Sequence, residues 1–312
     1  MRKLVRNLIL ILGLCFFSLP LMAISQIEQL EVLEPSKANI HGFMDVSFKN
    51  DYITPRGLLV TKKDLTTQVL AVIGLDLYKN PDPAEIINKM SVTAFVWNDL
   101  WHGQHNHNVG AWNEFDWGAG TNVTLLQDWT LGAQYLEFLS PPGNFASEKN
   151  IEFLVAYDDS KWGLSVRFKP YTKFFWAVTG DSTVVVGKHG HTFDVEIGLV
   201  PTVDFKNTDF PVVVSLPTWI TVGPAQFWNG GTGGLKHKNS NCGVFSTGLR
   251  LELPISYIPV SYGSWYLHAG VQYYHLINDS LLKAQMTTLG LTSLSSAHRN
   301  IYVASAGIGF RF

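Results

Sequence analysis

Apolar and polar residues alternate along most of the chain with a period of two. Within residues 40–49, Met44 and Phe48 fall on one side of an extended chain, and Asp45 and Lys49 fall on the other. Successive side chains of a β-strand point to opposite faces of its sheet, so this spacing predicts a strand with one apolar and one polar face. The same pattern, interrupted by turn residues, predicts strands at 40–49, 67–78, 89–98, 113–125, 128–139, 150–157, 162–176, 192–205, 211–222, 243–253, 264–276 and 300–312.

The connections between the predicted strands differ in length between the two ends of the sheet. Residues 158–161 and 206–209 are short turns, whereas residues 100–112, 223–241 and 278–299 are long loops. Short turns at one end and long loops at the other are typical of outer-membrane β-barrels, whose short turns face the periplasm. An even number of strands then places both the N- and the C-terminus in the periplasm. Two turns, before the third strand and after the tenth, are longer than this rule expects.

A water-soluble β-sandwich or barrel also produces alternation, so the polar face has to be considered separately. Charged residues stand opposite the apolar face on nearly every predicted strand, which does not suit a soluble protein whose core is built from the apolar faces alone. The sequence therefore predicts an all-β fold, a transmembrane antiparallel up-and-down β-barrel of about twelve strands in a bacterial outer membrane. Apolar faces then contact lipid and polar faces line the lumen.

The polar faces supply the candidate pore-lining residues. They are Asp45, Lys49, Asp76, Glu114, Asp116, Glu152, Arg167, Lys169, Asp194, Glu196, Arg250, Glu252, His268 and Arg311. One interpretation is a water-filled pore for small hydrophilic solutes or ions, with a charged constriction. The other is a network of paired charges that fills the interior, because buried charges require partners. Acids outnumber bases in this set, so a pore is expected to prefer cations mildly.

The N-terminal residues resemble a targeting segment. Three basic residues within the first six positions precede an apolar run over residues 8–17, which is typical of a cleaved secretory signal peptide at 1–23. Residues 24–37 would then be a periplasmic extension, either poorly ordered or a partial plug, ahead of a barrel at 38–312. Removing the first 23 residues leaves 20 basic against 25 acidic side chains, so no nucleic-acid partner is expected.

Candidate chemistry is sparse. His102, His105 and His107 cluster in one predicted loop, and imidazoles are metal ligands, but no cysteine or carboxylate stands at a fixed ligand spacing beside them. We therefore expect no metal and no cofactor. No nucleophile motif is present, so no enzyme activity is expected. The long loops leave one alternative to a porin, a largely occluded barrel with a surface-binding, adhesive or structural role.

The last predicted strand carries aromatic residues at its end. Phe310 and Phe312 lie on its apolar face, where an aromatic girdle meets the membrane interface. A terminal phenylalanine on such a strand resembles the signal by which outer-membrane proteins are recognised by the barrel assembly machinery. The expected partners are that machinery, outer-membrane lipid and lipopolysaccharide, and small hydrophilic solutes.

Two segments in the first half of the chain carry a more specific set of motifs. Residues 45–78 contain the pairs Asp51-Tyr52 and Arg56-Gly57, followed by Thr61. The second segment contributes Glu114, Asp116, Gly120, Tyr135, Pro141, Pro142 and Glu152. Together they resemble the TorF-type porins of Gram-negative outer membranes, although Pro55 stands where that family usually has an aromatic residue. The resemblance implies an outer-membrane barrel with a porin-like role.

Overall fold

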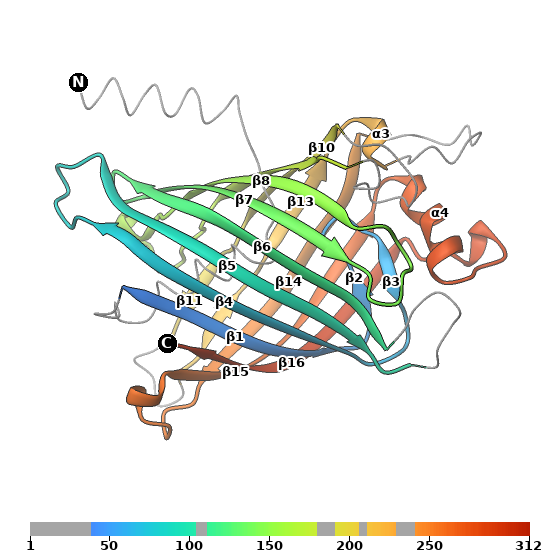
Figure 1. Cartoon of the computed structure of the whole chain (residues 1–312). Helices are drawn as coiled ribbons and strands as arrows, with labels where there is room; N and C mark the ends of the chain where they lie inside the picture. The colour runs from blue at the N-terminus through green and yellow to red at the C-terminus, as the bar shows by residue number, and fades with distance from the viewer. Residues whose placement is uncertain (1–38, 104–110, 180–190, 206–210, 229–240) are drawn as a thin grey trace.

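The computed structural model describes residues 39–103, 111–179, 191–205, 211–228 and 241–312, and in this part of the chain antiparallel strands close into one barrel (Figure 1). The wall has twelve strands in chain order, two of them interrupted. They are β1 (Ile40–Lys49), β4 (Thr66–Lys79), β5 (Ile87–Trp101), β6 (Trp112–Leu125), β7 (Trp129–Leu139), β8 (Glu148–Tyr157), β9 (Tyr171–Ala177), β10 (Thr192–Leu199) with β11 (Thr202–Asp204), β12 (Val213–Ser215) with β13 (Thr218–Val222), β14 (Cys242–Pro254), β15 (Ser264–Leu276) and β16 (Asn300–Arg311).

The barrel closes where the first and last strands pair. The ladder between β1 and β16 runs from Phe43 opposite Arg311 to Lys49 opposite Ser305. Beyond it, the amide of Phe312 donates to the carbonyl of Gly42 at 3.0 Å, and the amide of Gly42 donates to the carbonyl of Phe312 at 3.0 Å. The predicted antiparallel up-and-down barrel of about twelve strands is thus confirmed.

The two ends of the barrel differ. One end carries the connections at 80–86 and 255–263, and we call it the turn end. The other end carries α3 (Ala225–Trp228) and α4 (Asp279–Thr288), and we call it the loop end (Figure 1). Three 3-10 helices complete the described elements, η2 (Ser160–Trp162), η3 (Val260–Tyr262) and η4 (Leu294–Ser296). No helix in the described residues is long and apolar enough to cross a bilayer.

The outer surface of the wall is apolar and exposed. On β4, Ile73, Leu75 and Leu77 are 53%, 40% and 59% exposed, while the intervening Asp76 is 6% exposed. The same parity holds on β16, where Tyr302 and Ile308 face outward. An apolar outer surface on a sheet whose first and last strands pair is what hydrocarbon requires, because backbone polar groups within a membrane have to pair inside the protein.

Residues 162–170 differ from the sequence prediction, which placed them in a strand. They form η2 and an irregular segment instead, and β9 begins at Tyr171. The Asp159 carboxylate accepts the amides of Phe168 at 2.6 Å and Lys169 at 3.2 Å, so these amides are not available to a ladder. Pro170 has no amide to donate. Local capping by a carboxylate has replaced the pairing that the apolar alternation suggested.

A hairpin that the sequence analysis did not predict enters the lumen from the loop end. Its strands β2 (Tyr52–Ile53) and β3 (Leu59–Thr61) pair with each other in a sheet separate from the wall. The turn has Pro55 at its second position, and the Gly57 amide donates to the Thr54 carbonyl at 2.9 Å. Gly57 has φ of 92°, and a Cβ there would come within 2.9 Å of Leu281. The Arg56-Gly57 pair therefore shapes the tip of the hairpin.

The hairpin lies in the loop half of the lumen, and α4 covers it at the loop end (Figure 1). Leu59 of β3 is fully buried in a cluster of apolar side chains from the wall, α3 and α4. The Thr288 hydroxyl of α4 donates to the Leu59 carbonyl at 2.6 Å. Asn278 caps α4, because its side chain accepts the Ser280 amide at 2.9 Å. Other members of the cluster are Ile53, Leu154, Ala156, Tyr171, Phe175, Ala177, Trp219, Phe227, Trp228, Val244, Tyr274, Leu276, Leu281, Leu282, Ile301 and Val303.

Several expectations lie outside the described residues. The signal peptide at 1–23 and the extension at 24–37 belong to that part of the chain, as do His105 and His107. The periplasmic placement of both termini stays a prediction.

The two faces of the wall predict opposite responses to a charge. We expect Ala119→Lys, at an exposed outward position near the middle of β6, to lower the free energy of unfolding in phospholipid vesicles by about 2–4 kcal/mol. Asn122→Lys, an inward position on the same strand, should change it by less than about 1 kcal/mol. Urea titration of both variants measures the free energy of unfolding. Equal losses of stability in the two variants would contradict the assignment of the outward and inward faces.

Candidate functional site

The acidic candidates predicted on strands all lie inside the barrel wall. Asp45, Asp76, Glu114, Glu152, Asp194, Glu196 and Glu252 are each at most 9% exposed, and an Asp116 carboxylate oxygen is buried as well. His268 is also buried, at 4% exposure. The structure sorts these side chains into separate groups rather than one continuous polar channel. That they line a path for solutes stays a prediction.

Two candidates lie elsewhere than on a strand. Arg167 belongs to the irregular segment before β9, where its backbone forms a bridge with Thr202. Its amide donates to the Thr202 carbonyl at 3.0 Å. Lys169 lies in the same segment and lines a cavity at the turn end. The prediction of a β-strand around these two residues was wrong for the reason given above, the capping by Asp159.

The central group is built around Arg56, at the tip of the inserted hairpin. Its Nε lies 3.1 Å from Asp194 Oδ1, and its Nη2 lies 3.6 Å from Glu152 Oε1. The guanidinium carbon is 3.4 Å from the centre of the Phe175 ring. Gln134 donates to the other Glu152 oxygen at 3.0 Å. One cation therefore joins the hairpin to carboxylates on β8 and β10, across the lumen.

A second contact fixes the base of the hairpin. The Tyr52 hydroxyl donates to Glu114 Oε2 at 2.8 Å, and its ring packs 5.5 Å from that of Trp97. Asp51 accepts the Lys63 amide at 2.6 Å, and the Tyr52 amide donates to the Thr61 hydroxyl at 3.1 Å. The residues Asp51-Tyr52, Arg56-Gly57 and Thr61, which carry the family resemblance, thus all form the hairpin. Two of its acidic partners, Glu114 and Glu152, belong to the second resembling segment.

A neighbouring buried group lies on β9 and β10. Lys173 Nζ is 3.1 Å from Glu196 Oε1, and the Tyr171 hydroxyl donates to the same oxygen at 3.0 Å. Lys173 and Glu196 are 1% and 4% exposed. Buried charges in this setting are tolerated because they meet an opposite charge and a hydrogen-bond donor.

The turn half of the lumen holds a different group. Glu252 accepts Arg250 Nε at 3.0 Å and Arg311 Nη2 at 2.9 Å, one guanidinium on each carboxylate oxygen. His268 Nε2 lies 2.9 Å from Asp45, which also accepts the Ser47 hydroxyl at 2.5 Å. At the rim, Asp76 meets Lys79 at 2.6 Å, Lys89 at 3.5 Å and His41 at 3.6 Å.

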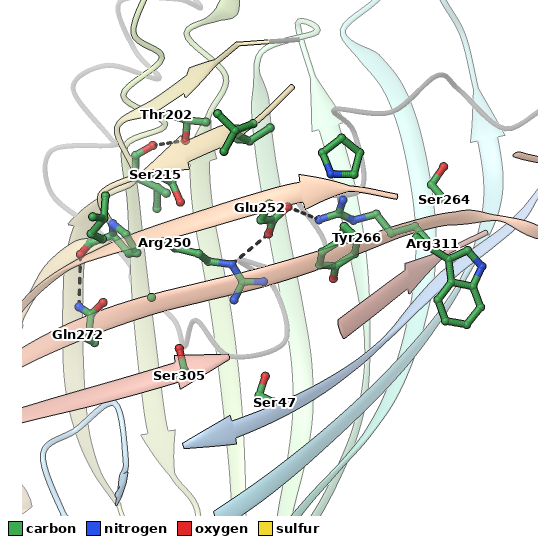
Figure 2. Close-up of a pocket in the computed structure, with 18 of the residues that line it drawn as sticks. Ser47, Thr202, Ser215, Arg250, Glu252, Ser264, Tyr266, Gln272, Ser305 and Arg311 are labelled. Atoms are coloured by element: carbon green, nitrogen blue, oxygen red, sulfur yellow. Dashed lines mark hydrogen bonds and ion pairs between the residues drawn. The ribbon is translucent and has the colours of Figure 1, made fainter. Parts of the chain in front are cut away.

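A cavity of about 480 Å³ lies beside this group. Figure 2 shows Arg250 and Arg311 directed toward Glu252, with Tyr266 beside Arg311, and Ser47 and Ser305 on neighbouring strands. The Arg311 guanidinium lies 3.9 Å from the centre of the Tyr266 ring. Pro55 of the hairpin, Trp219 and Tyr274 also line the cavity. It therefore extends from the turn end to the tip of the hairpin.

The histidine and phenylalanine candidates occupy separate places. His102 Nε2 is 2.8 Å from the Thr67 hydroxyl, and among the described residues no three His, Cys, Asp or Glu side chains are grouped to hold a metal. Phe310 packs against Trp265, with ring centres 4.8 Å apart, and stacks on Phe312 at 5.6 Å. These contacts hold both phenylalanines at the turn end, and their role in assembly stays a prediction.

Neither a protein-family model nor a curated protein sequence matches the chain. Several solved barrels are similar in structure. The COG4313 outer membrane channel from Pseudomonas putida F1 has a TM-score of 0.44 at 10% identity, covering 90% of this chain and 100% of that one. OprB of Pseudomonas putida has a TM-score of 0.42 at 8% identity, covering 88% and 93%. The transport unit of the Escherichia coli autotransporter AIDA-I has a TM-score of 0.41 at 12% identity, covering 90% and 92%.

At these scores and identities, none of the solved structures assigns an activity to this chain. The class of protein follows from the chain's own structure. A closed antiparallel barrel with an exposed apolar exterior and buried charges inside is an outer-membrane β-barrel.

Arg56 is the one described cation that joins the hairpin tip to the two carboxylates of β8 and β10. Replacing it with methionine leaves Glu152 and Asp194 buried without that cation, so we expect Arg56→Met to lower the free energy of unfolding by about 3–5 kcal/mol. Lys161→Met, which removes a half-exposed pair with Asp128, should lower it by about 1 kcal/mol or less. Urea titration in detergent measures both.

A compensating variant tests the cause. Combining Arg56→Met with Glu152→Gln and Asp194→Asn removes both orphaned charges and should recover most of the lost stability. A triple variant as unstable as Arg56→Met alone would show that the hairpin is held by packing rather than by charge.

Proposed function

We propose that the chain is a porin-type channel for small hydrophilic solutes or ions, and that the hairpin β2–β3 closes it in this conformation. The observation that carries this proposal is that the segment filling the loop half is not part of the wall. The hairpin strands pair with each other and with no strand of the barrel. The wall therefore keeps its complete ladder whether the hairpin is inside or outside.

The contacts that hold the hairpin suit a reversible closure. Its polar links to the wall include one arginine to two carboxylates and one tyrosine hydroxyl to a third. Displacing the hairpin would leave Glu114, Glu152 and Asp194 facing the lumen, where entering water can solvate them. The acidic lining supports the earlier expectation of a mild cation preference.

The resemblance to the TorF-type porins is consistent with this proposal. The first motif of that resemblance forms the hairpin. In the second motif, Glu114 accepts the Tyr52 hydroxyl and Glu152 forms an ion pair with Arg56. Two segments far apart in sequence thus meet at the point of closure.

One observation favours the alternative, an occluded barrel with a binding or structural role. The loop half is closed by α4 as well as by the hairpin, and Leu59, Leu276 and Leu281 in that region are fully buried. In this reading the hairpin never leaves. A variant without the hairpin should conduct under both proposals. The gated channel and the occluded barrel therefore differ only in whether the intact chain conducts.

The test is single-channel recording in a planar bilayer. We expect the intact chain to show rare, brief openings, because the hairpin must leave before solute enters. Replacing residues 52–61 with a short Gly-Ser linker should give frequent steps of several-fold higher mean current, with reversal potentials favouring cations. The matched control replaces residues 141–146, an exposed loop between β7 and β8, and should behave as the intact chain.

Heat-modifiable electrophoretic mobility verifies that each variant is a folded barrel. An intact chain that stays silent under all voltages, while the hairpin variant conducts, would establish the occluded barrel. A folded hairpin variant that is also silent would refute the role of the hairpin as the barrier.

A further inference from the structure

The cavity at the turn end has a composition that differs from the rest of the lumen. Its volume of about 480 Å³ falls in the range of small-molecule sites. We propose that it binds a small organic anion with an apolar body, such as an aromatic or short-chain carboxylate. This goes beyond the proposed channel function, because binding at the turn end does not require the hairpin to move.

The charges of the lining favour an anion. Four cationic side chains, Lys49, Lys169, Arg250 and Arg311, line the cavity, and Glu252 is the one carboxylate among the described lining residues. Both oxygens of Glu252 are already occupied, by Arg250 at 3.0 Å and Arg311 at 2.9 Å. A ligand cation would therefore compete with two guanidinium groups for one acid.

Asp45, a carboxylate that Arg250 approaches from the cavity, has partners of its own. Asp45 lies 2.9 Å from His268 and accepts the hydroxyl of Ser47, and Arg250 Nη2 is 3.9 Å away. Lys49 donates to a neutral acceptor, the Gln68 amide oxygen, at 2.5 Å. The ammonium group of Lys49 is therefore hydrogen-bonded to a neutral amide in this contact and not to a carboxylate. A concave site with excess positive charge raises the local concentration of anions.

The remaining lining favours an apolar body over a sugar. Val213, Ile255 and Val303 contribute apolar surface, and Trp219 and Tyr274 meet edge to face at the inner end, with ring centres 5.9 Å apart. Hydroxyl groups of Ser215 and Ser305 supply a few polar contacts among them (Figure 2). A few polar groups in an apolar cavity fix the orientation of a ligand while its body is desolvated. A carboxylate would meet the guanidinium groups, with the apolar part against the aromatic end.

The experiment is isothermal titration calorimetry of the full barrel in detergent with three probes of matched shape. Phenylacetate carries a negative charge, 2-phenylethanol none and 2-phenylethylammonium a positive charge, and titration into empty micelles is subtracted. We expect saturable binding of phenylacetate, with affinity at least about tenfold above that for the alcohol, and no saturable binding of the amine.

Variants locate the site. Lys49→Gln and Arg311→Gln should each weaken phenylacetate binding about tenfold and leave the alcohol unchanged. Ser305→Phe fills the cavity without changing its charge, so it should abolish binding of both. The matched control is Lys161→Gln, which removes a half-exposed lysine at the same end that pairs with Asp128 outside the cavity, and it should bind as the intact chain does.

Several results would overturn the proposal. They are equal affinity for all three probes, tightest binding of the amine, absence of saturable binding, or full binding by a folded Ser305→Phe variant. None of these affects the conductance of the hairpin variant. A silent channel would likewise leave the binding result standing, so the two proposals fail independently.

Discussion

Backbone amides and carbonyls in hydrocarbon have no water to bond with, and this requirement determines the rest of the structure. Each must pair within the protein, so the sheet has to close, and here β1 meets β16 over the register from Phe43–Arg311 to Lys49–Ser305. Closure fixes the parity of every strand, with Ile73 and Leu75 toward lipid and Asp76 inside. Charged side chains, which the core of a soluble protein would exclude, therefore lie in the interior. Each of them needs an opposite charge or a hydrogen-bond partner.

A wall of twelve strands encloses more space than its own inward side chains fill, since filled interiors belong to barrels of about eight strands. The chain meets this in two ways. In the loop half, a hairpin supplies apolar side chains such as Leu59 together with Arg56, the cation that two wall carboxylates need. In the turn half no inserted segment is present among the described residues, and a cavity remains. In the loop half, the hairpin both fills the lumen and supplies the paired cation. In the turn half, charges of the wall pair with one another and the space stays open.

The wall was predictable because strand periodicity is a local property. The alternation predicted β1, β15 and the start of β16 at the residues observed. It was wrong at 162–170, where the Asp159 carboxylate accepts two backbone amides. The hairpin was not predictable in this way. Its strands of two and three residues are too short to show a period. Arg56 bonds to Asp194, 138 positions away, a pairing that only the closed barrel brings about. In the sequence this segment was marked only by the resemblance motif, Asp51-Tyr52, Arg56-Gly57 and Thr61.

The positions of the lumen charges show why the ion preference cannot be inferred from the numbers of acidic and basic residues alone. The predicted set contains more acids than bases, which suggested a mild cation preference for a pore. In the structure, acids of the loop half are paired within the lumen: Glu152 and Asp194 lie beside Arg56, Glu196 beside Lys173, and Glu114 accepts the Tyr52 hydroxyl. The bases gather at the turn-end cavity, where Glu252 is shared between two guanidinium groups. Because electrostatic fields act over a Debye length of roughly 8 Å, each half presents its own sign to a solute. If both proposals hold, an anion is favoured at the cavity and a cation at the opened constriction, and binding and conduction would then select different ions in one barrel.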